Sequence, residues 1–388
     1  MVNGNDLNVQ ALLVSLRHHM AISYQGDEHN ARWCLVGRFP DSSSSWQFGV
    51  EQPFLRVFQP VKPQKNRKLG PAFDPSFDPH RDVLSDFPSI AAARLGGTVD
   101  EFNRLLSVQL AVCNLRCWHC YVEDCLVWPC EGCPRVETPG CEHGRLSGIT
   151  YLTATNILDA IRKQIECDRA NGQGARHAVR LTGGEPLLAP QLILMLLRGI
   201  RERGYERNVW FRCETNLVPL LLLEAVGDKD SYPHRSDGGK LATILDSLAQ
   251  FRNLSVHPAF HGLSEHGFTA NTQVRLPCFD LLINALRSLI ARGIDVYPSF
   301  GGNVCDPAEI PAFFERLRGI SKNLPLRVAL RRYDLGYKPI ARRIAQLRKS
   351  KTPPITFDYG QSIDAWDALI IKAYGRRYAQ TPRWRVCL

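Results

Sequence analysis

From residue 105 onward, short apolar segments with strand character alternate with amphipathic helical segments, and this alternation limits the fold more than any other feature. The strand-like segments are residues 106–112, 178–182, 209–213, 254–257, 294–299 and 326–330. The helical patterns between them are residues 153–170, 191–203, 240–251, 277–292 and 307–318. Thr153 or Thr155 can cap the first of these helices. Six βα repeats predict an α/β fold, specifically a partial (βα)6 TIM-like barrel that is open on one side.

The repeats cover only part of the 388 residues, so we expect flanking regions. Residues 1–100 are predicted to be an N-terminal extension of unknown role, with a helical pattern at 8–18, apolar stretches at 33–36 and 54–61, and loop-forming residues between them. Residues 101–335 form the predicted core, interrupted by a cysteine-rich insertion at 122–148. Residues 336–388 form a basic C-terminal segment.

The use of cysteine indicates a reducing compartment. The chain has 13 cysteines, and its first residues lack a charged stretch followed by a sustained apolar run. The longest apolar run, residues 217–226, is interrupted by Pro219 and Glu224 and is too short to span a bilayer. We therefore expect a cytoplasmic protein without a membrane partner, whose cysteines bind metal instead of forming disulfides.

The formal net charge of +10 suggests an anionic partner. A nucleotide, a phosphorylated metabolite, an acidic peptide or RNA would each fit, and a generally basic surface is the simpler explanation. Nucleic acid is not favoured, because no known RNA-binding motif accompanies the charge.

The motif CNLRCWHC follows the first predicted strand and contains Cys113, Cys117 and Cys120. Loops after parallel strands are where ligands gather in such folds. Three thiolates on one tight loop can hold three irons of a [4Fe–4S] cluster and leave the fourth iron without a protein ligand. A zinc site is the alternative, with His119 as a rival ligand.

The motif LTGGEP follows the second predicted strand, with Gly183, Gly184, Glu185 and Pro186. Paired glycines let a ligand approach the backbone closely, and the carboxylate can accept hydrogen bonds from an ammonium group. On its own, this motif would be ordinary turn chemistry.

In this order the two motifs resemble those of the radical S-adenosylmethionine (SAM) superfamily, over residues 105–330. The resemblance implies that the cysteine triad carries the cluster and that the amino and carboxylate groups of SAM chelate the free iron. It implies that the Gly183–Pro186 motif holds the methionyl amine and that His119 lies beside the adenine. After the third strand, RCETNL resembles a ribose contact through Glu214 and Asn216, although the family usually has glycine where this chain has Leu217.

The activity implied by this resemblance is reductive cleavage of SAM to methionine and a 5′-deoxyadenosyl radical, which removes hydrogen from a substrate. The substrate is unidentified, and the net charge of +10 predicts that it is anionic. Such an enzyme is oxygen-sensitive and takes electrons from a donor such as flavodoxin or ferredoxin. The substrate could be a small molecule, a nucleotide or a peptide. Alternatives are an activating enzyme for a glycyl-radical protein, an RNA- or peptide-modifying radical SAM enzyme, and a non-catalytic zinc- and RNA-binding module.

A second cysteine group lies in the insertion. It comprises Cys125, Cys130, Cys133 and Cys141, with His143 nearby. Four thiols this close form a plausible zinc site or a second iron–sulfur cluster, and unligated thiols are the simpler alternative.

Two later stretches carry further polar residues. Residues 256–272 contain His257, His261 and His266, which could bind substrate, although one or two are expected to be ordinary loop residues. A basic stretch follows the sixth strand, with Arg331, Arg332, Lys338, Arg342 and Arg343. A solvated helix face is the favoured interpretation of that stretch, and a clamp on a phosphate or acidic substrate is the alternative.

Overall fold

The computed structural model describes residues 24–25, 33–37, 46–49, 52–58, 86–102, 104–122, 127, 149–172, 176–221, 235–274 and 278–388. The strands are β1 (Tyr24–Gln25), β2 (Trp33–Gly37), β3 (Trp46–Gly49), β4 (Gln52–Phe58), β5 (Leu105–Leu110), β6 (Ile149–Thr153), β7 (His177–Gly183), β8 (Val209–Thr215), β9 (Leu254–Phe260), β10 (Asp295–Val296), β11 (Ser299–Gly301) and β12 (Ala329–Arg331). The helices are α2 (Phe87–Leu95), α4 (Ala154–Ala170), α5 (Pro190–Glu202), α7 (Arg235–Leu248), α8 (Glu265–Thr272), α9 (Phe279–Ala291), α10 (Ile310–Ile320), α11 (Lys338–Lys349) and α12 (Tyr359–Tyr374).

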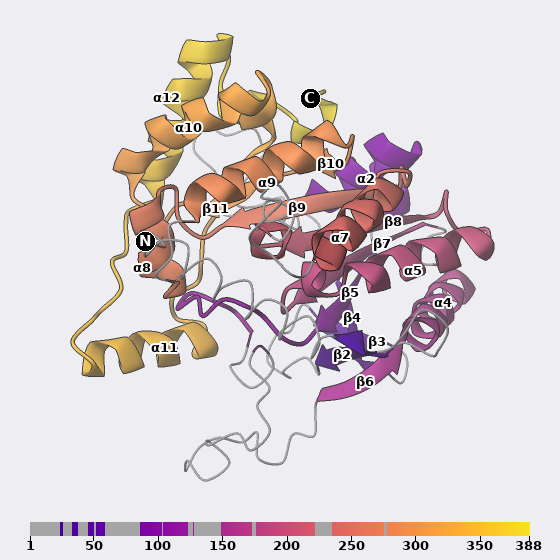
Figure 1. Cartoon of the computed structure of the whole chain (residues 1–388). Coiled ribbons are helices and arrows are strands. Elements are labelled where there is room, and N and C mark those ends of the chain that lie inside the picture. The colour runs from indigo at the N-terminus through magenta and orange to yellow at the C-terminus, as the bar shows by residue number, and fades with distance from the viewer. Residues whose placement is uncertain are drawn as a thin grey trace.

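The strands form one sheet whose main path runs β1-β2-β5-β7-β8-β9-β11-β12 (Figure 1). Neighbours from β5 to β12 along this path are parallel. This arrangement confirms the predicted α/β class with a mostly parallel sheet. All six predicted strands are present, although the fifth is divided into β10 and β11 and the sixth begins only at Ala329.

The N-terminal strands extend this sheet. β2 and β4 both pair antiparallel with β5, β3 pairs with β4, and β6 pairs with β2. The two apolar stretches predicted within the first 100 residues therefore contribute strands next to the parallel core. The predicted helix at 8–18 lies outside the described residues.

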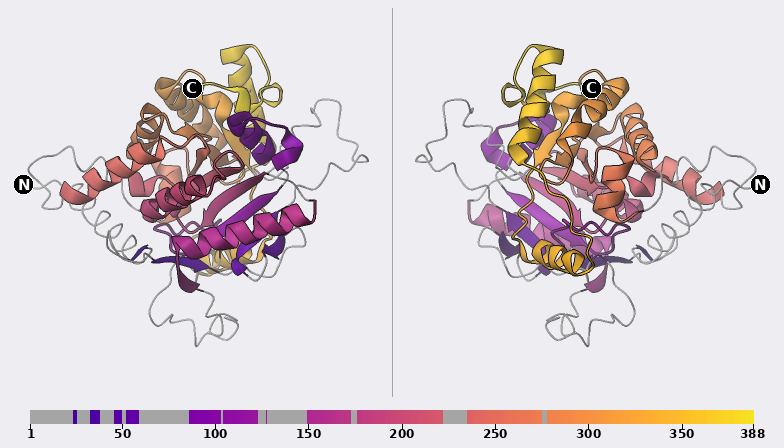
Figure 2. Two further views of the ribbon diagram at one scale, coloured as in Figure 1. Left: turned by 90° about the vertical axis from the view of Figure 1, so that its right-hand side faces the viewer. Right: turned by 90° about the vertical axis from the view of Figure 1, so that its left-hand side faces the viewer.

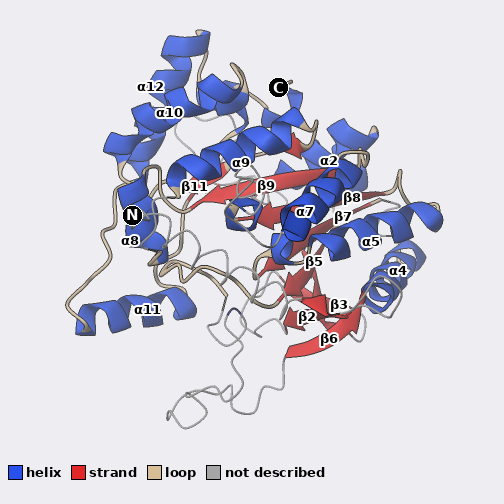
Figure 3. Cartoon of the chain, in the orientation of Figure 1, coloured by secondary structure: helices blue, strands red, loops and turns tan. Residues whose placement is uncertain are grey.

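Helices α4, α5, α7 and α9 follow one another along one side of the sheet, and α10 and α12 lie beyond them (Figures 1 and 3). Apolar side chains from these helices and from alternate strand positions form the main core. Thr153 caps α4, as expected, by accepting a hydrogen bond from the backbone N–H of Asn156 at 3.1 Å. No helix within the described ranges is long and apolar enough to cross a bilayer.

The opposite side of the sheet is covered differently (Figure 2). There α2 packs against the beginnings of β5, β7 and β8 in a second, smaller core that includes Phe87, Trp210 and Tyr297. Near the C-terminus, Arg383 bonds to Asp86 just before α2, with Nε to Oδ2 at 2.9 Å. Towards the carboxyl ends of the strands, polar side chains take the place of this apolar packing.

Candidate metal centre

The loop after β5 carries Cys113, Cys117 and Cys120. Cys117 is buried, and the other two thiols are partly buried. The three lie close enough to influence one another: burial, followed by the charges of Cys113 and Cys120, raises the pKa of the Cys117 thiol well above its usual range. The structure therefore brings the predicted cysteine triad together on one loop.

Residues far away in the sequence hold this loop. Trp118 donates from its indole N–H to Oδ1 of Asn271 on α8 at 2.8 Å, and the side-chain amide of Asn271 donates to the Val304 carbonyl at 2.8 Å. The Arg343 guanidinium, from α11, donates to the carbonyl of Cys120 and, at 2.5 Å, to that of Val122. The conformation of the loop thus depends on helices that follow it by more than 150 residues.

The paired glycines allow β7 to end against the start of the cysteine loop. The Val112 carbonyl, directly before Cys113, accepts the backbone N–H of Glu185 at 2.8 Å, and Val112 has a positive φ of 70°. A Cβ added to Gly184 would lie 1.9 Å from that carbonyl oxygen. Gly183 has φ +99°, in the region that favours glycine. In the described structure, then, this motif packs backbone against backbone.

Glu185 connects two strand ends. Its carboxylate is buried and accepts the backbone N–H of Leu187 at 2.9 Å and that of Asn216 at 2.6 Å. Burial raises the pKa of Glu185 to about 7, although these two N–H donors oppose the shift. Pro186 begins the short 3-10 helix Pro186–Leu188.

Asn216 lies beside the cysteine loop. Its side-chain amide donates to Oδ1 of Asn114 at 3.0 Å and points at Sγ of Cys113 at 3.7 Å. The next residue, Leu217, has φ 66°, a left-handed conformation that glycine adopts freely and that costs a leucine about 1 kcal/mol. The chain thus has leucine where the superfamily that it resembles usually has glycine, but it keeps the backbone conformation that glycine favours.

Glu214, the other predicted ribose contact, already has partners from the protein. Its carboxylate accepts from Arg180 at 2.7 Å and from the Thr182 hydroxyl at 2.9 Å, and it forms an ion pair with Arg212 at 3.0 Å. Burial alone would raise its pKa, but the charges of Arg180, Arg212 and Arg331 outweigh burial and hold the pKa well below its usual range. Glu214 is therefore ionised and bound by arginines.

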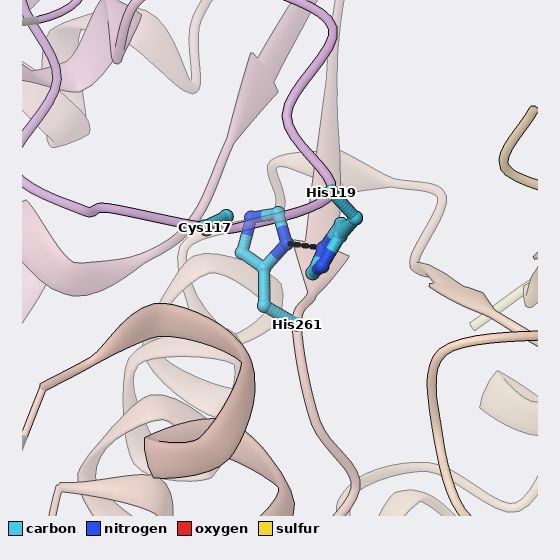
Figure 4. A group of neighbouring side chains, drawn as sticks. All are labelled: Cys117, His119 and His261. Atoms are coloured by element: carbon cyan, nitrogen blue, oxygen red, sulfur yellow. Dashed lines mark hydrogen bonds between the residues drawn. The ribbon is translucent and has the colours of Figure 1, made fainter. Parts of the chain in front are cut away.

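A three-residue group offers a second way to bind metal at this loop (Figure 4). Ligand atoms of Cys117, His119 and His261 all lie within 4.8 Å of one another, and Nε2 of His119 is 3.0 Å from Nδ1 of His261. Burial, then nearby positive charge that includes Arg331, lowers the pKa of both histidines, that of His261 to about 4. Both rings are neutral near pH 7, the form that binds metal. The Tyr333 ring packs edge-on against His119 at 4.6 Å.

The donor set around the thiols fits a [4Fe–4S] cluster. Besides Asn216, the backbone N–H groups of Leu115 and Val122 point at Sγ of Cys113 and Cys120, at 3.5 and 3.4 Å. Hydrogen bonds to sulfur of this kind surround iron–sulfur clusters and adjust their reduction potentials. Buried thiols whose pKa values are raised become thiolates only when a metal supplies the compensating positive charge.

Comparison with known families supports an iron–sulfur role for this loop. Residues 106–221 match the model of a family described as a 4Fe-4S single cluster domain, which is found in radical SAM-type proteins. This chain contains a 4Fe–4S cluster domain. The matched residues include the cysteine loop, the paired glycines and the end of β8. No curated protein matches the chain.

The remaining predicted residues have different outcomes. Cys125, Cys130, Cys133 and Cys141 lie outside the described residues, as does His143. His266 is exposed, but it lies on α8 and not in the predicted loop, whereas His257 is buried within β9. In the basic stretch, the prediction of a solvated helix face is wrong for two members: Arg343 is buried against the cysteine loop, and Arg331 ends β12 beside Glu214. Arg332, Lys338 and Arg342 are exposed.

Three polar residues near the site are not singled out by any sequence motif, namely Gln109, Arg180 and Arg212. All three lie within strands, at positions that alternate with apolar residues. That alternation was the available signal, because in a sheet with one face on an apolar core it marks the residues on the opposite face.

Proposed function

We propose that this chain is a radical SAM enzyme whose parallel strands form a partial (βα)6 barrel and whose cysteine triad, Cys113, Cys117 and Cys120, holds a [4Fe–4S] cluster. The observation that carries the proposal is the location of these three thiols on one loop within the match to a 4Fe–4S single cluster domain. The strand-end network of Glu185 and Asn216, next to the same loop, supports it.

When bound, the cluster supplies the electron that cleaves SAM to methionine and the hydrogen-abstracting 5′-deoxyadenosyl radical. The residues of the chain bind and orient the cosubstrate. The Gly183–Pro186 motif receives the methionyl amine, with Glu185 as its acceptor, and the side chains of Asn216 and Glu214 lie on the ribose side. His119, held by His261 and Tyr333, offers its ring to the adenine. N–H donors to the thiolate sulfurs stabilise the reduced centre.

Further parts of the proposal concern the setting of the enzyme. The electron donor is a small redox protein such as flavodoxin or ferredoxin, and the protein works in the cytoplasm and is sensitive to oxygen. The second cysteine group, Cys125, Cys130, Cys133 and Cys141, holds a zinc ion or another iron–sulfur cluster.

The deciding experiment is reduction of the anaerobically reconstituted full-length protein in the presence of SAM, with 5′-deoxyadenosine measured by chromatography. Cys117→Ala should abolish its formation, whereas Cys387→Ala, which removes an exposed cysteine elsewhere, should leave the yield unchanged. Wild-type protein that leaves SAM intact under strong reductant, or Cys117→Ala protein that still cleaves it, would overturn the proposal.

A mononuclear zinc centre is a second candidate, favoured by the grouping of Cys117 with His119 and His261. A zinc protein purified without oxygen would be colourless and lose its metal on His261→Ala substitution. A cluster protein would be brown, with about four or more irons per chain, and would keep its iron in that variant.

A further inference from the structure

Polar side chains line one face of the central strands, on the side of the sheet opposite the main core. The register of β5, β7, β8 and β9 places four polar residues next to one another across these strands, namely Ser107, Arg180, Arg212 and Ser255. Two residues further towards the carboxyl ends of the strands, Glu214 on β8 is paired with His257 on β9. Arg331 reaches the same group from the end of β12. We call Gln109, Arg180, Arg212, Glu214, His257 and Arg331 the polar face.

The polar face carries more positive than negative charge. Three guanidinium groups surround one carboxylate, with Arg331 at 4.0 Å from Glu214 in addition to the closer Arg180 and Arg212. Other acidic groups on this side have their own arginine partners, since Asp86 pairs with Arg383 and Asp295 with Arg327. Buried charge of one sign is costly unless a counter-ion compensates it.

Within the part of the chain that the structure describes, several buried donors on this face have no hydrogen-bond partner. They are Nε2 of Gln109, Nε of Arg180, and Nε and Nη2 of Arg331, and both ring nitrogens of His257 are also without one. Gln109 and His257 are 3% and 1% exposed. Native proteins satisfy nearly all such atoms, so a concentration of them on one face indicates that a ligand provides the acceptors. A ligand that meets mainly guanidinium and amide N–H groups is an anion.

The position of the polar face relates it to the cysteine loop. Arg331 lies near enough to His119 and His261 for its charge to lower their pKa values. Away from the loop, the polar face meets the smaller core. There the His257 ring stacks on Tyr297, which belongs to that core, with the ring centroids 5.2 Å apart. The side chains of Arg180 and Arg331 retain 18% and 17% exposure, so the face is not sealed from solvent.

We propose that the polar face binds the substrate and that this substrate is a small organic anion, whose carboxylate or phosphate group is held by Arg180 and Arg331. Gln109 and His257 hydrogen-bond to the polar groups next to that anionic group, and Glu214 keeps the guanidinium groups oriented. The inference rests on the proposed function, because it assigns the substrate class of the same reaction.

The test measures binding of two probes, inorganic phosphate and malonate, to the reconstituted full-length protein by calorimetry, with chloride keeping the ionic strength constant. We expect at least one probe to bind, and the one that does identifies the anionic group. Arg331→Gln should weaken that binding about tenfold or more, because it removes charge-assisted hydrogen bonds. Arg162→Gln removes the same charge from the exposed face of α4 and should leave binding unchanged.

Unfolding without added anion separates a binding role from a structural one. If Arg331 served the fold, Arg331→Gln would lower the unfolding temperature. The proposal predicts an unchanged or higher temperature, since the substitution relieves repulsion with Arg180 and Arg212. A lower temperature in this variant, or equal probe affinity in variant and wild type, would overturn it.

Two further results separate this inference from the proposed function. Wild-type protein that cleaves SAM but binds neither probe refutes the anion site alone, whereas protein that does not cleave SAM refutes the proposed function whatever it binds. Probes that compete with SAM in equilibrium dialysis would assign the arginines to the SAM carboxylate and so refute a separate substrate site.

Discussion

The backbone N–H of Asn216 donates a hydrogen bond of 2.6 Å to the Glu185 carboxylate. Through it the end of β8 is joined to the turn after β7, and the side chain of Asn216 continues the connection to Sγ of Cys113 on the loop after β5. Three strands that are adjacent in the sheet thus share one hydrogen-bond network at their carboxyl ends. This network fixes the surroundings of the cysteine loop.

Glu185→Gln should weaken this network. One amide oxygen cannot replace two carboxylate oxygens, so the N–H of either Leu187 or Asn216 loses its acceptor. A buried donor left unsatisfied costs about 1–3 kcal/mol, and the free energy of unfolding in urea should fall by that amount. Glu202→Gln, at the exposed end of α5, is the matched control and should leave it within about 0.5 kcal/mol. Equal stability of the two variants would show that the network contributes nothing.

Arg343→Gln should loosen the cysteine loop. The guanidinium donates to the carbonyls of Cys120 and Val122, and a shorter neutral side chain cannot hold both. We expect less iron per chain after reconstitution and faster loss of the iron–sulfur absorbance in air. Arg342→Gln removes the same charge from an exposed neighbour on α11 and should behave like wild type. Identical iron content and decay in the two variants would contradict a role for Arg343 in holding the loop.

His257 should make the free energy of unfolding sensitive to acid. Burial, then the charges of Arg212 and Arg383, lowers its pKa in the folded protein well below the unfolded value of about 6.5. Below pH 6.5 the unfolded chain therefore binds a proton that the folded chain does not, and stability falls with decreasing pH by at most about 1.4 kcal/mol per pH unit. His257→Phe keeps an aromatic ring against Trp210 and Tyr297 but cannot titrate.

The measurement is the free energy of unfolding of both proteins between pH 5 and 8. Glu185, whose pKa is raised to about 7, has the opposite effect on stability in part of this range, so the difference between the two proteins is the quantity to follow. The stability of wild type relative to His257→Phe should decrease below pH 6.5. A difference independent of pH would refute the shifted titration of His257.

The fold was predictable where the apolar pattern had a single interpretation. Runs such as those that became β7, β8 and β9 are short, apolar and bounded by helical patterns, and each forms a parallel strand. The fifth run was harder, because residues 297 and 298 interrupt it and divide it into β10 and β11. The first two residues of the sixth run, 326 and 327, belong to the 3-10 helix Leu324–Arg327, which the apolar pattern does not specify.

Within the site, the sequence identified groups that belong to one motif. Cys113, Cys117 and Cys120 lie within eight residues, so one loop suffices to bring them together. The sequence does not identify His261 as the partner of His119, because 142 residues separate them. Only the tertiary structure, in which α8 bonds to the cysteine loop, brings the two histidines together. The sequence predicts a solvated helix face for Arg343, and this is wrong because charge pattern alone does not show which turn of a helix packs inward.

The order of residues alone determined the parallel α/β class, the iron–sulfur motif and its place after the first core strand, since hydrophobic period and ligand spacing are local properties of a chain. Only the tertiary structure decided how the arginines are used. Arg180, Arg212 and Arg331 come from three strands, and they surround Glu214 because the strand register and the alternation of side chains direct them to one face of the sheet. Long-range register depends on the packing of the whole sheet, and no single segment specifies it.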